Sequence, residues 1–203
     1  MSEATWGVRG GGLRVVLATK NTGKVAELQR ILTDFELEGA SYEPGPETGS
    51  SFAENALAKA REGVAHTGLP SVADDSGLTV DALNGMPGIL SARWAGRHGD
   101  DLANLELVLA QLADVTERGA AFVCAAAYAL PDGRSEVVTG ELRGTLLHAP
   151  RGTNGFGYDP IFVPLGMSVT SAELSPEMKD AISHRGQAFR ALAPLLKAAL
   201  IAH

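Results

Sequence analysis

The sequence has very little of what several classes of protein need. Its single cysteine, Cys124, excludes an intrachain disulfide and any metal site built from several cysteines. The five histidines show no metal-ligand spacing, which argues against a zinc site. No apolar run reaches the 18 residues that would indicate a membrane span. The formal net charge of −7 argues against a nucleic-acid-binding surface, which is normally basic.

The remaining composition is that of a folded protein, with 45% hydrophobic and 20% charged residues. Aromatic residues are scarce at 5%, whereas the 24 glycines favour several tight loops. Cys124 lies in an apolar run typical of a buried strand and is expected to fill the core. Residues 1–12 contain three consecutive glycines and fit no secretory signal. We therefore expect a cytoplasmic protein with a flexible tail over residues 1–12 and one domain over residues 13–203.

Strand and helix patterns alternate along the chain, as in α/β proteins. A short β-branched run at 13–18 is followed by a polar loop and a helical pattern at 24–32. Ser51-Phe52-Ala53-Glu54 forms a capping-box pattern, which predicts a helix to about residue 62. Further predicted elements are strands at 70–73, 78–83, 121–130 and 135–142, a helix at 101–112, a short helix from 175, and a final helix from about 186 with Pro194 as its kink or its effective start.

A candidate anion-binding loop lies between the first strand and the first helix. Free backbone N–H groups at a helix N-terminus favour an anion, and Lys24 would add a positive charge. Thr19 and Asn21 supply further hydrogen-bonding groups. The loop is no Walker A motif, because Val25 follows Gly23-Lys24 where serine or threonine is required. By itself, the segment is more typical of an ordinary turn.

Adjacent acids in Asp74-Asp75-Ser76-Gly77 follow a predicted strand, where α/β enzymes often gather catalytic groups. Because successive strand residues point to opposite faces, only one acid is expected to face a cleft. Glu47 is a candidate second oxygen ligand for Mg2+, which prefers carboxylates, phosphate and water. The alternative is an Asx-type turn with no metal. Glu54 is already explained by the capping box.

Other candidate groups carry weaker signals. Lys59 lies two turns along the capped helix, where it is either a solvated lysine or a phosphate ligand. Phe156, between two glycines, could stack on a purine or be a buried aromatic in a glycine turn. Ser183-His184-Arg185 offers hydrogen-bond donors that could read a keto oxygen.

The order of these motifs resembles the inosine triphosphate pyrophosphatase family, whose members include dITP/XTP pyrophosphatases. The resemblance runs from about Leu13 to near Ala198. The motifs that carry it, in chain order, are Thr19-x-Asn21-x-Gly23-Lys24, Glu47-Thr48-Gly49 leading to Ser51-Phe52-Ala53-Glu54-Asn55-Ala56, Asp74-Asp75-Ser76-Gly77-Leu78, Pro87-Gly88 with Ser91-Ala92-Arg93, Gly155-Phe156-Gly157-Tyr158-Asp159-Pro160, and Ser183-His184-Arg185-Gly186.

The resemblance implies an α/β fold with an elongated mixed β-sheet flanked by helices, two lobes with the nucleotide cleft between them, and a homodimer. It implies Mg2+-dependent hydrolysis of ITP, dITP and XTP to the monophosphate and pyrophosphate. Glu47 and Asp75 match metal-associated acids, with Asp75 as the general base. The implied substrate-binding residues are Thr19, Lys20, Asn21, Thr22, Gly23, Lys24, Lys59, Ser76, Phe156, Gly157, Tyr158, Asp159, Lys179, His184 and Arg185.

Lys20 departs from this family pattern, which has a small or polar residue between the threonine and the asparagine. An inward-pointing Lys20 would alter phosphate affinity, whereas an outward one would not. Two other functions stay open at this stage. A Maf-type pyrophosphatase would act on pyrimidine or modified nucleotides, and a non-catalytic sensor would bind a nucleotide without hydrolysing it. The Gly155–Asp159 and Ser183–Arg185 segments disfavour the Maf-type function, and Glu47 and Asp75 together with Lys59 disfavour the sensor function.

Overall fold

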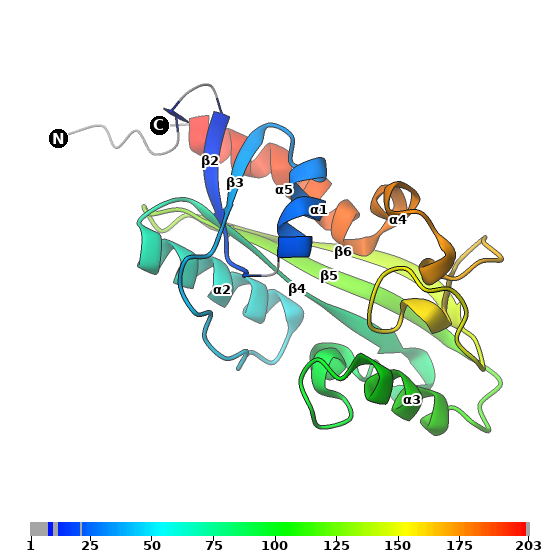
Figure 1. Cartoon of the computed structure of the whole chain (residues 1–203). Coiled ribbons are helices and arrows are strands. Elements are labelled where there is room, and N and C mark those ends of the chain that lie inside the picture. The colour runs from blue at the N-terminus through cyan, green and yellow to red at the C-terminus, as the bar shows by residue number, and fades with distance from the viewer. Residues whose placement is uncertain (1–7, 10–11, 21, 202–203) are drawn as a thin grey trace. The chain divides into compact units, whose positions relative to one another are not determined.

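The computed structural model describes residues 8–9, 12–20 and 22–201 (Figure 1). Within them, the strands follow the order β1-β2-β4-β5-β6-β7, and β3 pairs with β2. The strands are β1 (Val8–Arg9), β2 (Gly12–Leu17), β3 (Phe35–Gly39), β4 (Ser71–Val80), β5 (Gly119–Ala129), β6 (Ser135–Leu146) and β7 (Phe162–Pro164). The sheet is mixed, because β2 runs parallel to β3 and β4 but antiparallel to β1.

Helices connect and flank these strands, so the predicted α/β class with a mixed sheet is confirmed. They are α1 (Thr22–Ile31), α2 (Phe52–Thr67), α3 (Asp101–Gln111), α4 (Pro176–Ile182) and α5 (His184–Ile201), with short 3-10 helices at Asp81–Leu83, Gly88–Arg93, Asp159–Ile161 and Ser171–Glu173. In the described part of the chain, no helix has the length and apolar character that crossing a membrane requires.

The chain forms two compact units. The first comprises Met1–Asp75, Ala125–Gly140 and Arg185–His203, and the second comprises Ser76–Cys124 and Glu141–His184. The strands β4, β5 and β6 each contribute residues to both units. The extent of the single predicted domain stays a prediction, as does the tail, although Val8–Arg9 within it pairs antiparallel with Gly12 and Leu13.

Small side chains line the core of the first unit between α2 and the strands. Alanines from α2, β4 and β5 form one buried cluster with Ala18, which directly follows β2, and their size lets a helix approach a sheet closely. Ser51 caps α2 by accepting a hydrogen bond from the Glu54 N–H, as the capping-box pattern predicts. Glu54 itself accepts from the backbone and hydroxyl of Ser50. The helix continues to Thr67, five residues beyond the predicted end, where Gly68 takes a left-handed conformation.

Larger side chains fill the core of the second unit. Leu105, Val108 and Leu112 of α3 pack with Phe122 of β5 and with Phe162 of β7. The sequence spacing of Leu102, Leu105, Val108, Leu109 and Leu112 predicts one apolar face of α3, but Leu102 is 64% exposed. Cys124 is buried as expected.

Two further expectations were wrong. The Asp74–Gly77 segment does not follow a strand but lies within β4, which runs unbroken to Val80. Buried charged groups can occupy a strand interior when each has a partner, and both acids have one. One of the two alternatives for Pro194 was also wrong: it does not mark the start of the last helix, because α5 begins ten residues earlier at His184, whereas a kink at Pro194 stays a prediction.

Candidate active site

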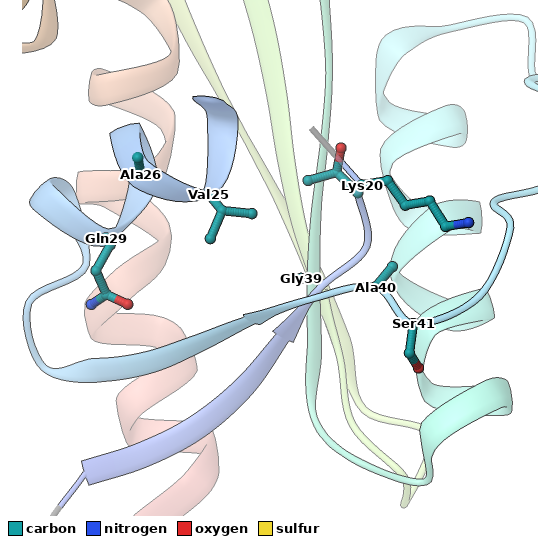
Figure 2. A pocket seen from close by; sticks show the side chains of 8 residues that line it. Lys20, Val25, Ala26, Gln29, Gly39, Ala40 and Ser41 are labelled. Carbon is teal, nitrogen blue, oxygen red and sulfur yellow. The ribbon is translucent and has the colours of Figure 1, made fainter. Parts of the chain in front are cut away.

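The loop between β2 and α1 is held at its first residue by the end of β3. The Ala40 N–H donates to the Thr19 carbonyl at 3.0 Å. A pocket of about 660 Å³ lies beside it, and Figure 2 shows its lining residues. Lys20 extends away from α1 and pairs with Glu43 at 2.5 Å, so its charge is directed outward along the surface. Asn21 lies outside the described residues, and Thr22 and Gly23 are described only as the backbone of α1.

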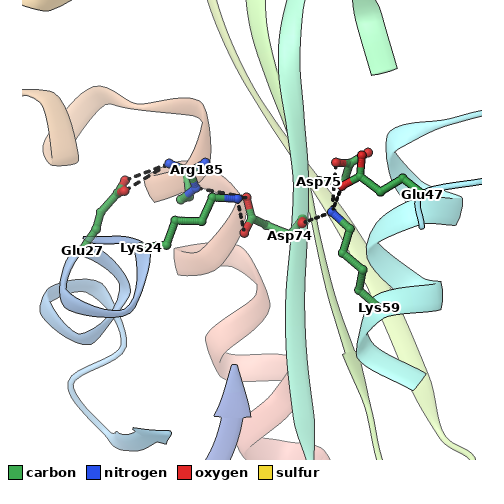
Figure 3. Close-up of polar contacts among 7 residues, drawn as sticks. All are labelled: Lys24, Glu27, Glu47, Lys59, Asp74, Asp75 and Arg185. Atoms are coloured by element: carbon green, nitrogen blue, oxygen red, sulfur yellow. Dashed lines mark hydrogen bonds and ion pairs between the residues drawn. The ribbon is translucent and has the colours of Figure 1, made fainter. Parts of the chain in front are cut away.

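β4 directs Asp74 and Asp75 to opposite faces, as alternation along a strand requires (Figure 3). Both side chains are buried, with Asp74 at 4% and Asp75 at 7% exposure. Their surroundings differ in charge. Asp74 faces side chains from α1 and α5, whereas Asp75 faces α2 and the loop before it.

On the Asp74 face, two cations share one carboxylate. Lys24 lies 3.3 Å from Asp74, and the Arg185 Nε donates to Asp74 Oδ2 at 3.1 Å. The other end of the Arg185 guanidinium pairs with Glu27 at 3.1 Å. Burial alone would raise the pKa of Asp74, but the positive charges of Lys24 and Arg185 outweigh it and hold that pKa well below its usual range. Asp74 therefore stays ionised and anchors both cations.

On the Asp75 face, one cation is shared by two acids. The Lys59 ammonium lies 2.5 Å from Glu47 Oε1 and 3.1 Å from Asp75 Oδ1. Asn55 donates to the other oxygen, Asp75 Oδ2, at 2.9 Å. Burial and the nearby Glu47 charge raise the pKa of Asp75 despite its contacts with Lys59 and Asn55. Burial would lower the pKa of Lys59, but Asp75 and Glu47 together raise it.

The Glu47–Asp75 pair has the chemistry of a divalent-cation site. Two carboxylates converge on one position of positive charge, which the Lys59 ammonium takes in this structure. Within the described ranges, no group of three or more His, Cys, Asp or Glu side chains could hold a metal ion. Such a small protein ligand set suits Mg2+, which takes one or two carboxylates and completes its shell with phosphate and water.

The second unit contains the Gly155–Asp159 loop, which presents an aromatic ring. Gly155 and Gly157 have φ of 74° and 60°, a conformation that disfavours other residues. Phe156 between them is 58% exposed, so it is no core residue. The Phe156 N–H donates to Asp159, which also pairs with Lys179. The Lys179 ammonium lies 5.3 Å from the centre of the Phe156 ring.

Two further contacts fix the same loop. The Gly157 N–H donates to Asp101 at the start of α3, at 2.9 Å. The buried Tyr158 hydroxyl donates to the Ser91 carbonyl at 2.8 Å. These hydrogen bonds hold Gly157 and Tyr158 in place, while the side chain of the adjacent Phe156 is exposed. Such a platform can receive a flat, apolar face of a ligand.

The structure thus brings the predicted residues into separate groups. Glu47, Lys59 and Asp75 meet in the first unit, as do Lys24 and Arg185 through Asp74. Phe156, Asp159 and Lys179 meet in the second unit, which also contains Ser76, Gly157, Tyr158 and His184. The His184 ring stacks on Phe122 with centroids 5.1 Å apart. Arg185, predicted to bind the base, has its guanidinium on Asp74 and Glu27.

Sequence reasoning missed three residues of these groups. Asp74 receives no role from the sequence, although it anchors two cations. Glu27 lies three residues after Lys24, a helical spacing that places both on neighbouring positions of α1. Asn55 lies four residues before Lys59 on α2, and that spacing was the available signal for a shared face.

Comparison with known proteins gives consistent matches along the chain. The model of the Ham1 family matches residues 15–195. A Streptomyces coelicolor protein named dITP/XTP pyrophosphatase is 61% identical over 194 residues, covering 91% of this chain and 97% of the relative. A crystal structure of a nucleoside-triphosphatase / dITP/XTP pyrophosphatase from Mycobacterium abscessus is 58% identical, with a TM-score of 0.75, covering 89% of this chain and 99% of that one. The Staphylococcus aureus Ham1 protein is 40% identical, with a TM-score of 0.83 over 91% and 98% of the chains.

Proposed function

The chain belongs to the Ham1 family, and from this we propose that it hydrolyses non-canonical purine nucleoside triphosphates, namely ITP, dITP and XTP. The products are the monophosphate and pyrophosphate, so the enzyme would cleanse the nucleotide pool. The observation that carries the proposal is the Glu47–Lys59–Asp75 cluster in a chain whose near-full-length relatives are named dITP/XTP pyrophosphatases.

Nucleoside-triphosphate pyrophosphatases of this family depend in general on a divalent metal, and we assign Mg2+ to this chain. Glu47 and Asp75 would hold it, because their carboxylate oxygens already converge on one positive charge. When bound, the ion neutralises triphosphate charge and favours one orientation of the phosphates.

The chain's own residues then account for the reaction. Asp75 would orient a water and accept its proton as the water oxygen attacks the α-phosphorus in line. The bond from the α-phosphorus to the oxygen that bridges it to the β-phosphorus breaks, and that oxygen leaves with the pyrophosphate. Lys24, Lys59 and the N–H groups at the start of α1 would stabilise the charge that develops on the leaving group. Ser76 and the Thr19–Lys24 loop would hold the triphosphate.

Base selection would depend on the Gly155–Asp159 loop together with Lys179, His184 and Arg185. Phe156 offers an exposed ring for stacking. Hypoxanthine and xanthine carry a keto oxygen where adenine carries an amino group, so protein donors would favour the former. Donors left unpaired by ATP would discriminate against it. We also propose a cytoplasmic homodimer that does not bind nucleic acid, as the sequence and the family resemblance imply.

The direct test is pyrophosphate release from ITP, XTP, GTP, ATP and dTTP with Mg2+, with and without chelator. We expect fast, chelator-sensitive release from ITP and XTP and slow release from the others. Preference for dTTP would instead indicate a Maf-type pyrophosphatase. Tight binding of ITP without turnover would indicate a nucleotide sensor.

A further inference from the structure

Asn55 is a buried amide in the first turn of α2. Its side chain contacts both Asp75 and the loop that carries Glu47. Its side chain is only 2% exposed. Nδ2 donates to Asp75 Oδ2 at 2.9 Å, and Oδ1 accepts from the Gly49 N–H at 2.8 Å. Gly49 lies two residues after Glu47 in the loop that precedes α2. One side chain therefore connects the strand that carries one acid to the loop that carries the other.

We propose that Asn55 is a positioning residue that fixes the carboxylate plane of Asp75 and the distance of Glu47 from it. This inference rests on the proposed function, in which both acids hold Mg2+ and Asp75 is the base. Neither a metal ligand nor a substrate contact is assigned to Asn55. Its effect passes through the two residues that it connects.

The chemistry of the position demands an amide of this length. The Gly49 N–H needs an acceptor, and the ionised Asp75 needs a donor, so one side chain must supply both. Aspartate would lose the donor and set two carboxylates side by side. Leucine has a similar size but satisfies neither group, so both the Gly49 N–H and the Asp75 carboxylate would lose a partner.

The contact at Gly49 is too close for any other residue. A Cβ there would lie 2.6 Å from Asn55 Oδ1 and 2.9 Å from Glu54 Cβ. The φ of Gly49 is not in the left-handed region, so lack of space rather than backbone conformation selects glycine. Gly49 therefore packs directly against Asn55, and a methyl group at residue 49 would push the loop away from Asn55.

Asn55 and Lys59 act as a pair on one face of α2. They are four residues apart, so their side chains are neighbours. Asn55 binds Oδ2 of Asp75 and Lys59 binds Oδ1, so each oxygen has one fixed partner. Lys59 also binds Glu47 directly, whereas Asn55 reaches the Glu47 loop through Gly49. If Glu47 and Asp75 held Mg2+, Asn55 would keep the two carboxylates at a fixed spacing.

The loop before α2 makes other hydrogen bonds to this helix. They show which contacts only anchor the loop and which also position Asp75. The Gly45 N–H donates to Glu62, and the Ser50 N–H donates to Glu54. Among the described residues, the hydrogen bonds to the Asp75 carboxylate come from Asn55 and Lys59, and neither Glu62 nor Glu54 takes part in them. Asn55 therefore both anchors the backbone of the loop and orients the Asp75 carboxylate.

The experiment compares Asn55→Ala with Asn104→Ala, a matched control in α3. Asn104 is also a buried helical amide, 1% exposed, and accepts from the Ala95 N–H at 2.7 Å without contacting an acid of the site. Rates of ITP hydrolysis are measured against Mg2+ concentration and normalised to folded protein. Binding of α,β-imido-ITP, which resists cleavage at the scissile bond, is measured with and without Mg2+.

For Asn55→Ala we expect kcat to fall about 10- to 100-fold, with KM for ITP within about threefold of wild type. We also expect the Mg2+ concentration for half-maximal rate to rise about tenfold, and the gain in analogue affinity from Mg2+ to shrink by a similar factor. Metal-free affinity for the analogue should not change. Asn104→Ala should leave all five quantities within about twofold after normalisation, because the described hydrogen bond of Asn104 is made to the Ala95 N–H and not to an acid of the site.

Mg2+ dependence equal to that of wild type in Asn55→Ala would overturn the proposal, as would an equal change in Asn104→Ala. If Asn55→Ala does not fold, Gly49→Ala decides instead, because it displaces the loop while Asn55 stays intact. Gly49→Ala should also raise the half-saturating Mg2+ concentration, and an unchanged value would refute the proposal. Failure of wild type to hydrolyse ITP would refute the proposed function separately, because analogue binding with and without Mg2+ still reports on Asn55.

Discussion

Asp74 and Asp75 are identical residues, adjacent in one strand and both buried, yet they lie in opposite electrostatic surroundings. Asp74 is one acid between two cations, Lys24 and Arg185, and its pKa is lowered. Asp75 is one of two acids around a single cation, Lys59, and its pKa is raised. An excess of positive charge stabilises the ionised form, whereas burial beside a second acid destabilises it.

This difference in surroundings indicates a structural role for Asp74 and a chemical role for Asp75. Asp74 holds α1 and α5 to β4 through ion pairs that its charge keeps intact. Asp75 contributes less to stability in its ionised form, because the fold raises its pKa. A site whose negative charge exceeds its local positive charge is suited to accept a further cation. Removing each acid should therefore affect different properties.

The largest expected effect follows from Asp75→Asn. The general base is lost while the hydrogen-bonding shape is kept, so kcat for ITP should fall about a thousandfold or more. Stopped assays of pyrophosphate release give kcat, and binding of α,β-imido-ITP gives nucleotide affinity. Affinity should change far less than kcat. Near-normal turnover in this variant would show that another group is the base.

Asp74→Asn should act mainly on folding. The variant leaves Lys24 and Arg185 without their shared counter-charge, and breaking one side of a buried ion pair costs about 3 kcal/mol or more. Unfolding in denaturant measures this loss of free energy. Asp75→Asn, by contrast, should leave the free energy of unfolding nearly unchanged or increase it. Equal destabilisation by both variants would remove the proposed distinction between the two faces.

Lys59→Met should affect the Asp75 face without changing either acid. Glu47 and Asp75 would then repel each other across the lost ammonium, and a charge that stabilises the leaving phosphates would be gone. We expect kcat to fall about 100-fold. Lys59→Arg restores the charge but not the compact ammonium, so it should recover only part of the rate. Full activity of Lys59→Met would assign this lysine to folding alone.

The smallest effect is expected for Arg185→Lys on the Asp74 face. Arg185 contacts Asp74 through Nε and Glu27 through Nη1, and one ammonium cannot span both acids in that geometry. The free energy of unfolding should fall by about 1–2 kcal/mol. Glu27→Gln should cost no more than this, because Asp74 still holds the guanidinium. Stability equal to wild type in Arg185→Lys would show that the bridge to Glu27 is unimportant.

The sequence was most informative where local patterns decide the structure. The capping box located the start of α2 at Phe52, and strand alternation correctly placed Asp74 and Asp75 on opposite faces. The motif order identified the family, and the family match over residues 15–195 and a relative covering 91% of the chain confirm that identification. The site residues taken from the family pattern, the Mg2+ assignment and the homodimer stay predictions.

The misses arose where distant residues decide the structure. Asp, Ser and Gly disfavour strands, so Asp74–Gly77 resembled a turn. It is a strand because Lys24 and Arg185, 50 and 111 residues from Asp74 in sequence, neutralise the buried acid. Likewise, Asn55 received no role because its partners, Gly49 and Asp75, meet only in the folded chain. Leu102 follows the α3 apolar period but lies at the exposed first turn.

The most direct test of this account measures ITP hydrolysis by Asp74→Asn and Asp75→Asn side by side. Both are assayed at saturating Mg2+ and ITP, and each rate is divided by the fraction of protein that is folded. We predict that Asp74→Asn keeps a rate within about tenfold of wild type, whereas Asp75→Asn loses about a thousandfold. The reverse order, with Asp75→Asn the more active variant per folded molecule, would contradict the assignment of chemistry to the Asp75 face.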